Sequence, residues 1–155
     1  MHDVLIVLHA AAGVIAFVLG VMALYATPQR SWSFAAYAVS LAAMAIFLLI
    51  VVATDWPDLD GSARGVYAGL LVLAAYMLYR CWRAWQRLRR QGSGQRGAYA
   101  DDIGFTLISL FDGFVIVAAI DLDAPVWLVV VIAIAGVAAG IAAVGQVKRR
   151  LSPEW

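Results

Sequence analysis

The chain contains five apolar runs, each about as long as a lipid bilayer is thick. They cover residues 4–26, 34–53, 65–85, 103–120 and 124–147. A helix needs roughly 20 apolar residues to cross the hydrocarbon core, and inside lipid only a helix or a closed barrel satisfies its own backbone hydrogen bonds. The sequence therefore predicts an all-α integral membrane bundle of five transmembrane helices, folded as a single transmembrane domain over residues 1–155.

Composition agrees with this prediction. Hydrophobic residues make up 65% of the chain and charged residues only 14%, and the mean hydropathy is +0.88. A soluble domain of this size carries about a quarter charged residues. Soluble classes of protein are therefore excluded, and the lipid bilayer is the first partner expected.

The charges are segregated between alternate loops. Residues 80–97 carry six arginines and residues 148–155 three basic residues, whereas residues 54–64 and 121–125 hold five aspartates and a single arginine. Basic loops stay in the cytoplasm. We therefore expect the N-terminus outside, the C-terminus in the cytoplasm, and a cytoplasmic basic loop at residues 86–100.

An arginine-rich stretch also suggests nucleic-acid binding. Because this one directly follows a span, we interpret it as a topology determinant that touches anionic lipid, and we expect no nucleic acid partner. The "GSGQRG" segment within it is typical of a flexible connector. It divides the chain into three N-terminal spans and a two-helix hairpin.

Small residues form a stripe on the first span. His9, Gly13, Ala16 and Gly20 fall within about 60° of one another at 100° per residue. Small residues let helix backbones approach closely, so we expect this stripe to face protein and His9 to point inward. Two further glycine pairs, four residues apart, have the same potential for helix packing, either within the chain or in a dimer: Gly65 with Gly69, and Gly136 with Gly140.

A carboxylate interrupts the fourth span. Asp112 lies among apolar or small residues, and polar groups inside a bilayer normally face other helices or a wet cavity. Thr106 and Ser109 lie on the same side of this helix, where the simpler interpretation is a hydroxyl bonded to the backbone one turn back. The sequence thus predicts a polar inward face on this helix.

The two ionisable groups, Asp112 and His9, are expected at similar depths in the membrane. Asp112 lies ~12 Å below the outer end of its span and His9 ~8 Å below the outer end of the first, at 1.5 Å per residue. We expect them to interact, directly or through one water, with Ser109 sharing the site. Three interpretations remain open: a structural pair, a functional proton or cation site, and a protonated Asp112 bonded to a backbone carbonyl.

The sequence predicts neither a bound cofactor nor catalytic activity. The only histidines, His2 and His9, lie on one helix about 10 Å apart, so one chain cannot sandwich a haem with them. That distance also prevents them from sharing a metal ion. With one cysteine, and without HExxH, GxSxG or a Walker loop, we expect no metal site, no cofactor and no enzymatic activity.

Three stretches taken together carry a resemblance: "LHAAAGVIAFVLGVMAL", "YMLYRCWRAWQRLRR" and "DDIGFTLISLFDGFVIVAAI". They resemble a family of predicted bacterial multi-pass membrane proteins of unknown function that open with a Leu-His-x-x-x-Gly helix. His9 and Gly13 match that opening, and Asp101 or Asp102 matches an acidic helix start. The family often has a His-Arg pair where this chain has "RSWSF". The resemblance implies a bacterial cytoplasmic (inner) membrane location and adds no activity.

These observations lead to three candidate functions. We expect a non-enzymatic accessory or assembly component that packs against itself or a larger membrane complex. The main alternative is a small transporter or proton-linked permease centred on Asp112 and His9. A haem- or quinone-binding redox subunit is the third.

Overall fold

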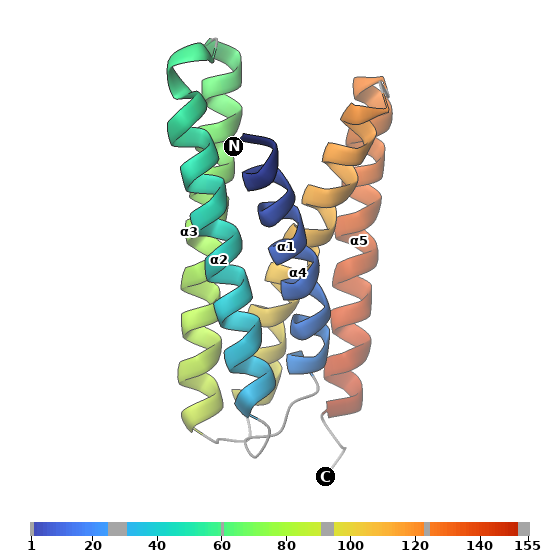
Figure 1. Cartoon of the computed structure of the whole chain (residues 1–155). Coiled ribbons are helices and arrows are strands. Elements are labelled where there is room, and N and C mark those ends of the chain that lie inside the picture. Colours follow the sequence, from blue (N-terminus) through green and yellow to red (C-terminus); the bar gives the residue numbers. More distant parts are fainter. Residues whose placement is uncertain (1, 25–30, 60, 91–94, 123–124, 152–155) are drawn as a thin grey trace. The chain divides into compact units, whose positions relative to one another are not determined.

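Five α-helices make up almost all of the described chain. The computed structural model describes residues 2–24, 31–59, 61–90, 95–122 and 125–151. The elements in chain order are α1 His2–Leu24, α2 Ser31–Asp55, the short 3-10 turn η2 Trp56–Asp58, α3 Gly61–Arg90, α4 Gln95–Asp121 and α5 Val126–Leu151 (Figure 1). The described residues contain no strand, so the all-α prediction is confirmed.

Four of the helices are long and apolar enough to cross a membrane. The crossing segments are Val4–Leu24, Trp32–Asp58, Arg64–Arg90 and Trp127–Arg149, in α1, α2, α3 and α5. Helices that are apolar on all sides suit a lipid environment, where no polar face is needed. A membrane crossing by α4 stays a prediction.

The helices extend beyond the expected spans on both sides of the basic loop. Residues 86–90 belong to α3 and residues 95–100 to α4, so most of the loop expected at 86–100 is helical. Arginine, glutamine and alanine are good helix formers, and a helix can continue past the hydrocarbon into the headgroups. Residues 25–26 and 124 of the expected spans, and 92–94 of the connector, lie outside the described residues.

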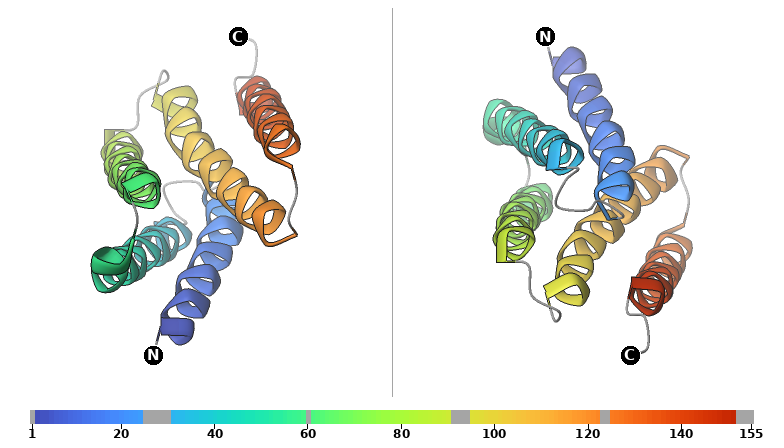
Figure 2. Two further views of the ribbon diagram at one scale, coloured as in Figure 1. Left: turned by 90° about the horizontal axis from the view of Figure 1, so that it is seen from above. Right: turned by 90° about the horizontal axis from the view of Figure 1, so that it is seen from below.

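The chain divides into two compact units, residues 1–82 and 83–155. This boundary falls inside α3, about ten residues before the connector at which the sequence suggested a division. In the first unit, α1 packs along α2 (Figure 2). The stripe of Gly13, Ala16 and Gly20 is buried, whereas the neighbouring Val14 is 51% exposed. Small residues on α1 therefore lie on its buried side.

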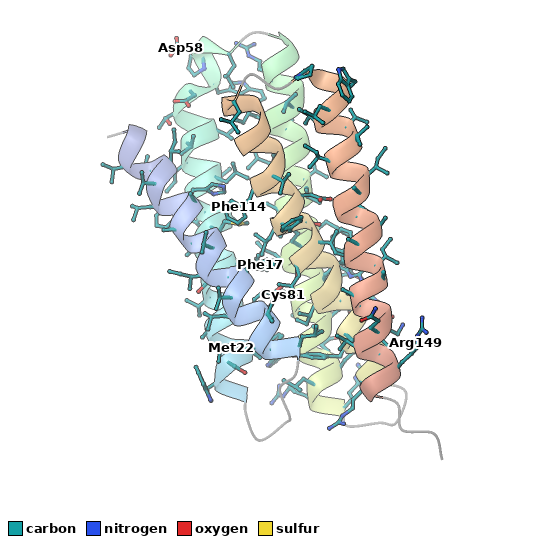
Figure 3. All side chains as sticks on the ribbon, turned by 90° about the vertical axis from the view of Figure 1, so that its right-hand side faces the viewer. Phe17, Met22, Asp58, Cys81, Phe114 and Arg149 are labelled. Carbon is teal, nitrogen blue, oxygen red and sulfur yellow. The ribbon has the colours of Figure 1, made fainter. Side chains whose placement is uncertain are left out.

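In the second unit, α4 and α5 form a helical hairpin (Figure 2). α5 begins directly after Pro125, whose carbonyl accepts a hydrogen bond from the backbone N–H of Leu128 at 2.8 Å. Proline suits a helix start because its missing N–H would have no partner there. Side chains project from α5 along its length in Figure 3. Five apolar ones on this helix are exposed: Val130, Val131, Ile134, Val137 and Ile141.

Candidate functional site

His9 joins α1 to α2. Its side chain is half-buried, and its Nδ1 lies 2.9 Å from the backbone oxygen of Met44. A carbonyl oxygen only accepts hydrogen bonds, so Nδ1 carries the proton and donates. When the ring is neutral, Nε2 is left as an acceptor. The histidine thus acts as a hydrogen-bonded link between two helices of the first unit.

Asp112 lies against a glycine of α5. Its Oδ1 occupies the space that a Cβ on Gly136 would need. That oxygen is buried and has no hydrogen-bond partner among the described residues. Gly136 is nine residues after Trp127 and thirteen before Arg149, which bound the crossing segment of α5. The carboxyl group therefore lies near the middle of that segment, where an uncompensated charge is costly.

The hairpin has a regular register of small residues against larger ones. Gly104 of α4 receives Val144 of α5, Gly140 of α5 receives Ile108 of α4, and Gly136 receives Asp112. Each step moves four residues forward along α4 and four back along α5, which is one turn of two antiparallel helices. One turn before Asp112 on α4, the equivalent position is Ile108. At Asp112 a carboxylate therefore takes the place of an aliphatic side chain.

Thr106 and Ser109 lie one or two turns before Asp112 on α4. The Thr106 hydroxyl is fully buried and donates to the backbone oxygen of Ile103 at 2.8 Å, the kind of backbone bond considered from the sequence. Ser109 is half-buried. Thr106 is thus satisfied within its own helix. His9 belongs to the first unit and Asp112 to the second, so their expected pairing stays a prediction.

Ion pairs at the start of α4 are the part of the site that the sequence reasoning missed. Asp101 binds Lys148 of α5, with Nζ 2.8 Å and 2.9 Å from the two carboxylate oxygens. Asp102 is only 1% exposed and binds Arg87 near the end of α3, with Nε 3.0 Å from Oδ2. Consecutive helical residues point about 100° apart, so the two aspartates reach different neighbours. Two adjacent acids that follow the arginine-rich segment were the available signal.

The two glycine pairs differ in their surroundings. Gly136 and Gly140 pack within the chain against α4, whereas a Cβ on Gly65 or Gly69 would meet no described atom within 4 Å. Both glycines of α3 are exposed. One pair therefore stabilises the hairpin, and the other leaves a small-residue face of α3 uncovered by the described chain.

Metal ligands do not gather in the described ranges, where no three His, Cys, Asp or Glu side chains lie close enough to hold an ion. Comparison with protein-family models, curated proteins and solved structures finds no match for this chain.

Proposed function

We propose that the protein is a non-enzymatic multi-pass protein of the bacterial cytoplasmic membrane, with its N-terminus outside. In this proposal it acts as an accessory or assembly component of a larger membrane complex, or as a homo-oligomer. The observation that carries the proposal is that polar side chains of the helices bind other helices of the same chain. His9 bonds the backbone of α2, and Asp102 pairs with Arg87. Such groups hold helices together in lipid.

The uncovered face of α3 supports association with a further helix. Gly65 and Gly69 are four residues apart and exposed, and glycines at this spacing let two helix backbones approach closely. The exposed apolar side chains of α5 are suited to lipid or to a second membrane protein. We also propose membership of the bacterial family that the sequence resembles, supported by the match of His9 and Gly13 to its opening motif.

Purification in a mild detergent tests the accessory function. We expect the intact particle to have a mass above that of one chain plus detergent, through extra copies or co-purifying subunits. The double variant Gly65→Leu/Gly69→Leu should reduce that mass. The matched control Val72→Leu, on an exposed part of the same helix, should leave it unchanged. A monomeric particle without partners would contradict the proposal, and a Soret absorption band would favour the redox function instead.

A proton- or cation-linked permease is the second candidate, and one observation favours it. Asp112 places a buried oxygen without a described hydrogen-bond partner near the middle of the α5 segment. A carboxyl group at that depth can exchange a proton or hold a small cation, because a neighbouring charge or ligand lowers the cost of its ionised form. His9, the other ionisable group expected at this depth, is the proposed second member of the site.

Asp112→Asn separates the two candidates. The amide keeps the shape of the side chain and cannot ionise. Under the accessory function we expect the variant to fold, assemble and unfold within about 1 kcal/mol of the wild type. A permease would instead lose proton flux in reconstituted vesicles while its fold survived. Flux in the wild type that disappears in the variant would reject the accessory function in favour of transport.

A further inference from the structure

The carboxyl group of Asp112 lies inside the hairpin of α4 and α5 with one oxygen enclosed. A Cβ on Gly136 would meet Oδ1 of Asp112 and Cε1 of Phe111, so the acid and an aromatic ring lie together against the backbone of α5. Oδ1 is buried and accepts no hydrogen bond from the described residues. A carboxylate normally accepts several hydrogen bonds. The surroundings of this oxygen are therefore unsuited to a negative charge.

Charges that could balance a carboxylate are absent from this level of the hairpin. Residues 128–144 of α5 have no nitrogen, oxygen or sulfur in their side chains. The nearest ionisable residues of α4 are themselves acids, Asp102 ten positions before Asp112 and Asp121 nine positions after it. Lys148 of α5 is twelve residues beyond Gly136, or ~18 Å along the helix, and binds Asp101. An ionised Asp112 would thus have no counter-charge within the hairpin.

The polar groups that a helix does offer at this level favour the neutral acid. Inside a helix the backbone N–H groups are already engaged, whereas each carbonyl oxygen keeps a second lone pair. Thr106 of α4 donates to such an oxygen, that of Ile103. A protonated carboxyl group has an O–H that can donate in the same way, but a carboxylate can only accept. Burial beside acceptors, without a donor or a cation, selects the protonated form.

A metal cation is a poor occupant of the same position. Hard metal cations take about six or more oxygen ligands. Within one turn of Asp112 on α4, the only other side-chain oxygen belongs to Ser109, and residues 128–144 of α5 supply none. A proton needs a single oxygen. The composition of the hairpin at this level therefore suits a proton and excludes a coordinated metal ion.

We propose that Asp112 is a proton-binding site, in which the carboxyl group is kept neutral against Gly136 and takes a proton in preference to a metal cation. The inference rests on the membrane location proposed above. It deepens the permease candidate by naming the ion as a proton. It also holds under the accessory function, where the neutral acid is a packing group between α4 and α5.

Infrared spectroscopy of the full-length protein in lipid bilayers at neutral pH tests the site. The C=O stretch of a protonated carboxylic acid lies above the amide I band, whereas ionised carboxylates absorb below it. We expect a carboxylic acid band in the wild type that is lost in Asp112→Asn. Asp58→Asn is the matched control, because it removes an exposed carboxyl group of the first unit and should leave the band unchanged.

A wild-type spectrum without this band would show an ionised Asp112, as in an ion pair with His9, and would overturn the proposal. Loss of the band when sodium chloride replaces choline chloride at equal ionic strength would do the same, because a metal ion would then have displaced the proton. Should Asp112→Asn fail to fold, Asp112→Glu keeps the acid and moves it by one methylene group. Its band must shift in frequency, and an unshifted band would assign the signal to another acid and reject the site.

Particle mass and proton flux test the proposed function separately from this site. A missing band rejects the proton site alone, whatever the mass of the particle. A band in a particle of more than one chain without flux supports a neutral packing acid in an accessory protein. A band in a single-chain particle rejects the accessory function and retains the proton site.

Discussion

His9 makes a contact that no apolar residue at its position could make. Its ring N–H donates to the Met44 carbonyl, which is already part of the α2 helix, so one oxygen accepts a second hydrogen bond from another helix. Carbonyl oxygens have two lone pairs and tolerate this arrangement. The bond fixes both the ring orientation and the height of α1 against α2. His9 therefore fixes the position of α1 against α2.

Replacing His9 should weaken the first unit by a small, measurable amount. We expect His9→Leu to lower the free energy of unfolding by about 1 kcal/mol, within the range for one interhelical hydrogen bond in a membrane protein. Val14→Leu, on the exposed side of α1, should change it little. Unfolding in a denaturing detergent followed by circular dichroism measures both. Equal stability of the two variants would mean that the bond contributes nothing.

At this scale the sequence predicted some partners and missed others. The backbone bond of Thr106 follows from local chemistry, because a hydroxyl in a helix always has a carbonyl one turn back. The pairing of Asp102 with Arg87 depends on how the end of α3 packs against α4, which no local pattern encodes. The link from His9 to Met44 likewise depends on the register of α1 against α2. The partner of a side chain within its own helix was predictable, and the specific partner on another helix was not.

Helices and their order were predictable because length and apolar composition determine them. The ends of the helices were less predictable, since arginine favours a helix as strongly as the apolar residues before it. Two glycines of α5 illustrate the limit of prediction. The spacing of Gly136 and Gly140 predicted a close helix contact, while the residues that would fill it, Ile108 and Asp112, depended on register.

Filling one of these glycine positions should destabilise the hairpin. A Cβ on Gly140 would overlap the branched side chain of Ile108, which is stiff and close to the backbone, so Gly140→Ala should cost about 1–3 kcal/mol. Gly136→Ala should cost less, because the end of the Asp112 side chain can rotate away. Gly145→Ala, which meets no described atom within 4 Å, should leave stability unchanged or slightly higher. A thermal melt in detergent ranks the three, and a Gly145 variant as unstable as the Gly140 variant would refute the register.

At the scale of the whole molecule, the distribution of charged residues predicts the orientation in the membrane. The six arginines of residues 80–97 lie near the turn from α3 to α4, and the aspartates of residues 54–64 lie near the turn from α2 to α3. Each lysine or arginine near a membrane end biases its loop toward the cytoplasm. Two of these arginines, Arg83 and Arg87, also form ion pairs with Asp102 where α3 meets α4, so they contribute to packing as well as to the expected topology.

Single cysteines test the orientation. In a Cys81→Ala background, which removes a buried thiol, Asp58→Cys and Ser93→Cys are compared in intact cells. We expect a membrane-impermeant maleimide to label residue 58 from outside, and residue 93 only after the membrane is opened. Figure 3 shows Asp58 at the end of the first unit where α2 turns toward α3. Labelling of residue 93 in sealed cells would reverse the assigned orientation.

The interlocked hairpin has a consequence for the synthesis of the protein. The ribosome completes α4 before any of α5 exists, and at that moment Asp101 and Asp112 have neither Lys148 nor Gly136 beside them. An acid within the expected span, Asp112, makes α4 a poor candidate to enter lipid alone. α4 is therefore expected to wait at the translocation channel until residue 148 has been added, and then to enter the bilayer together with α5 as a preassembled pair.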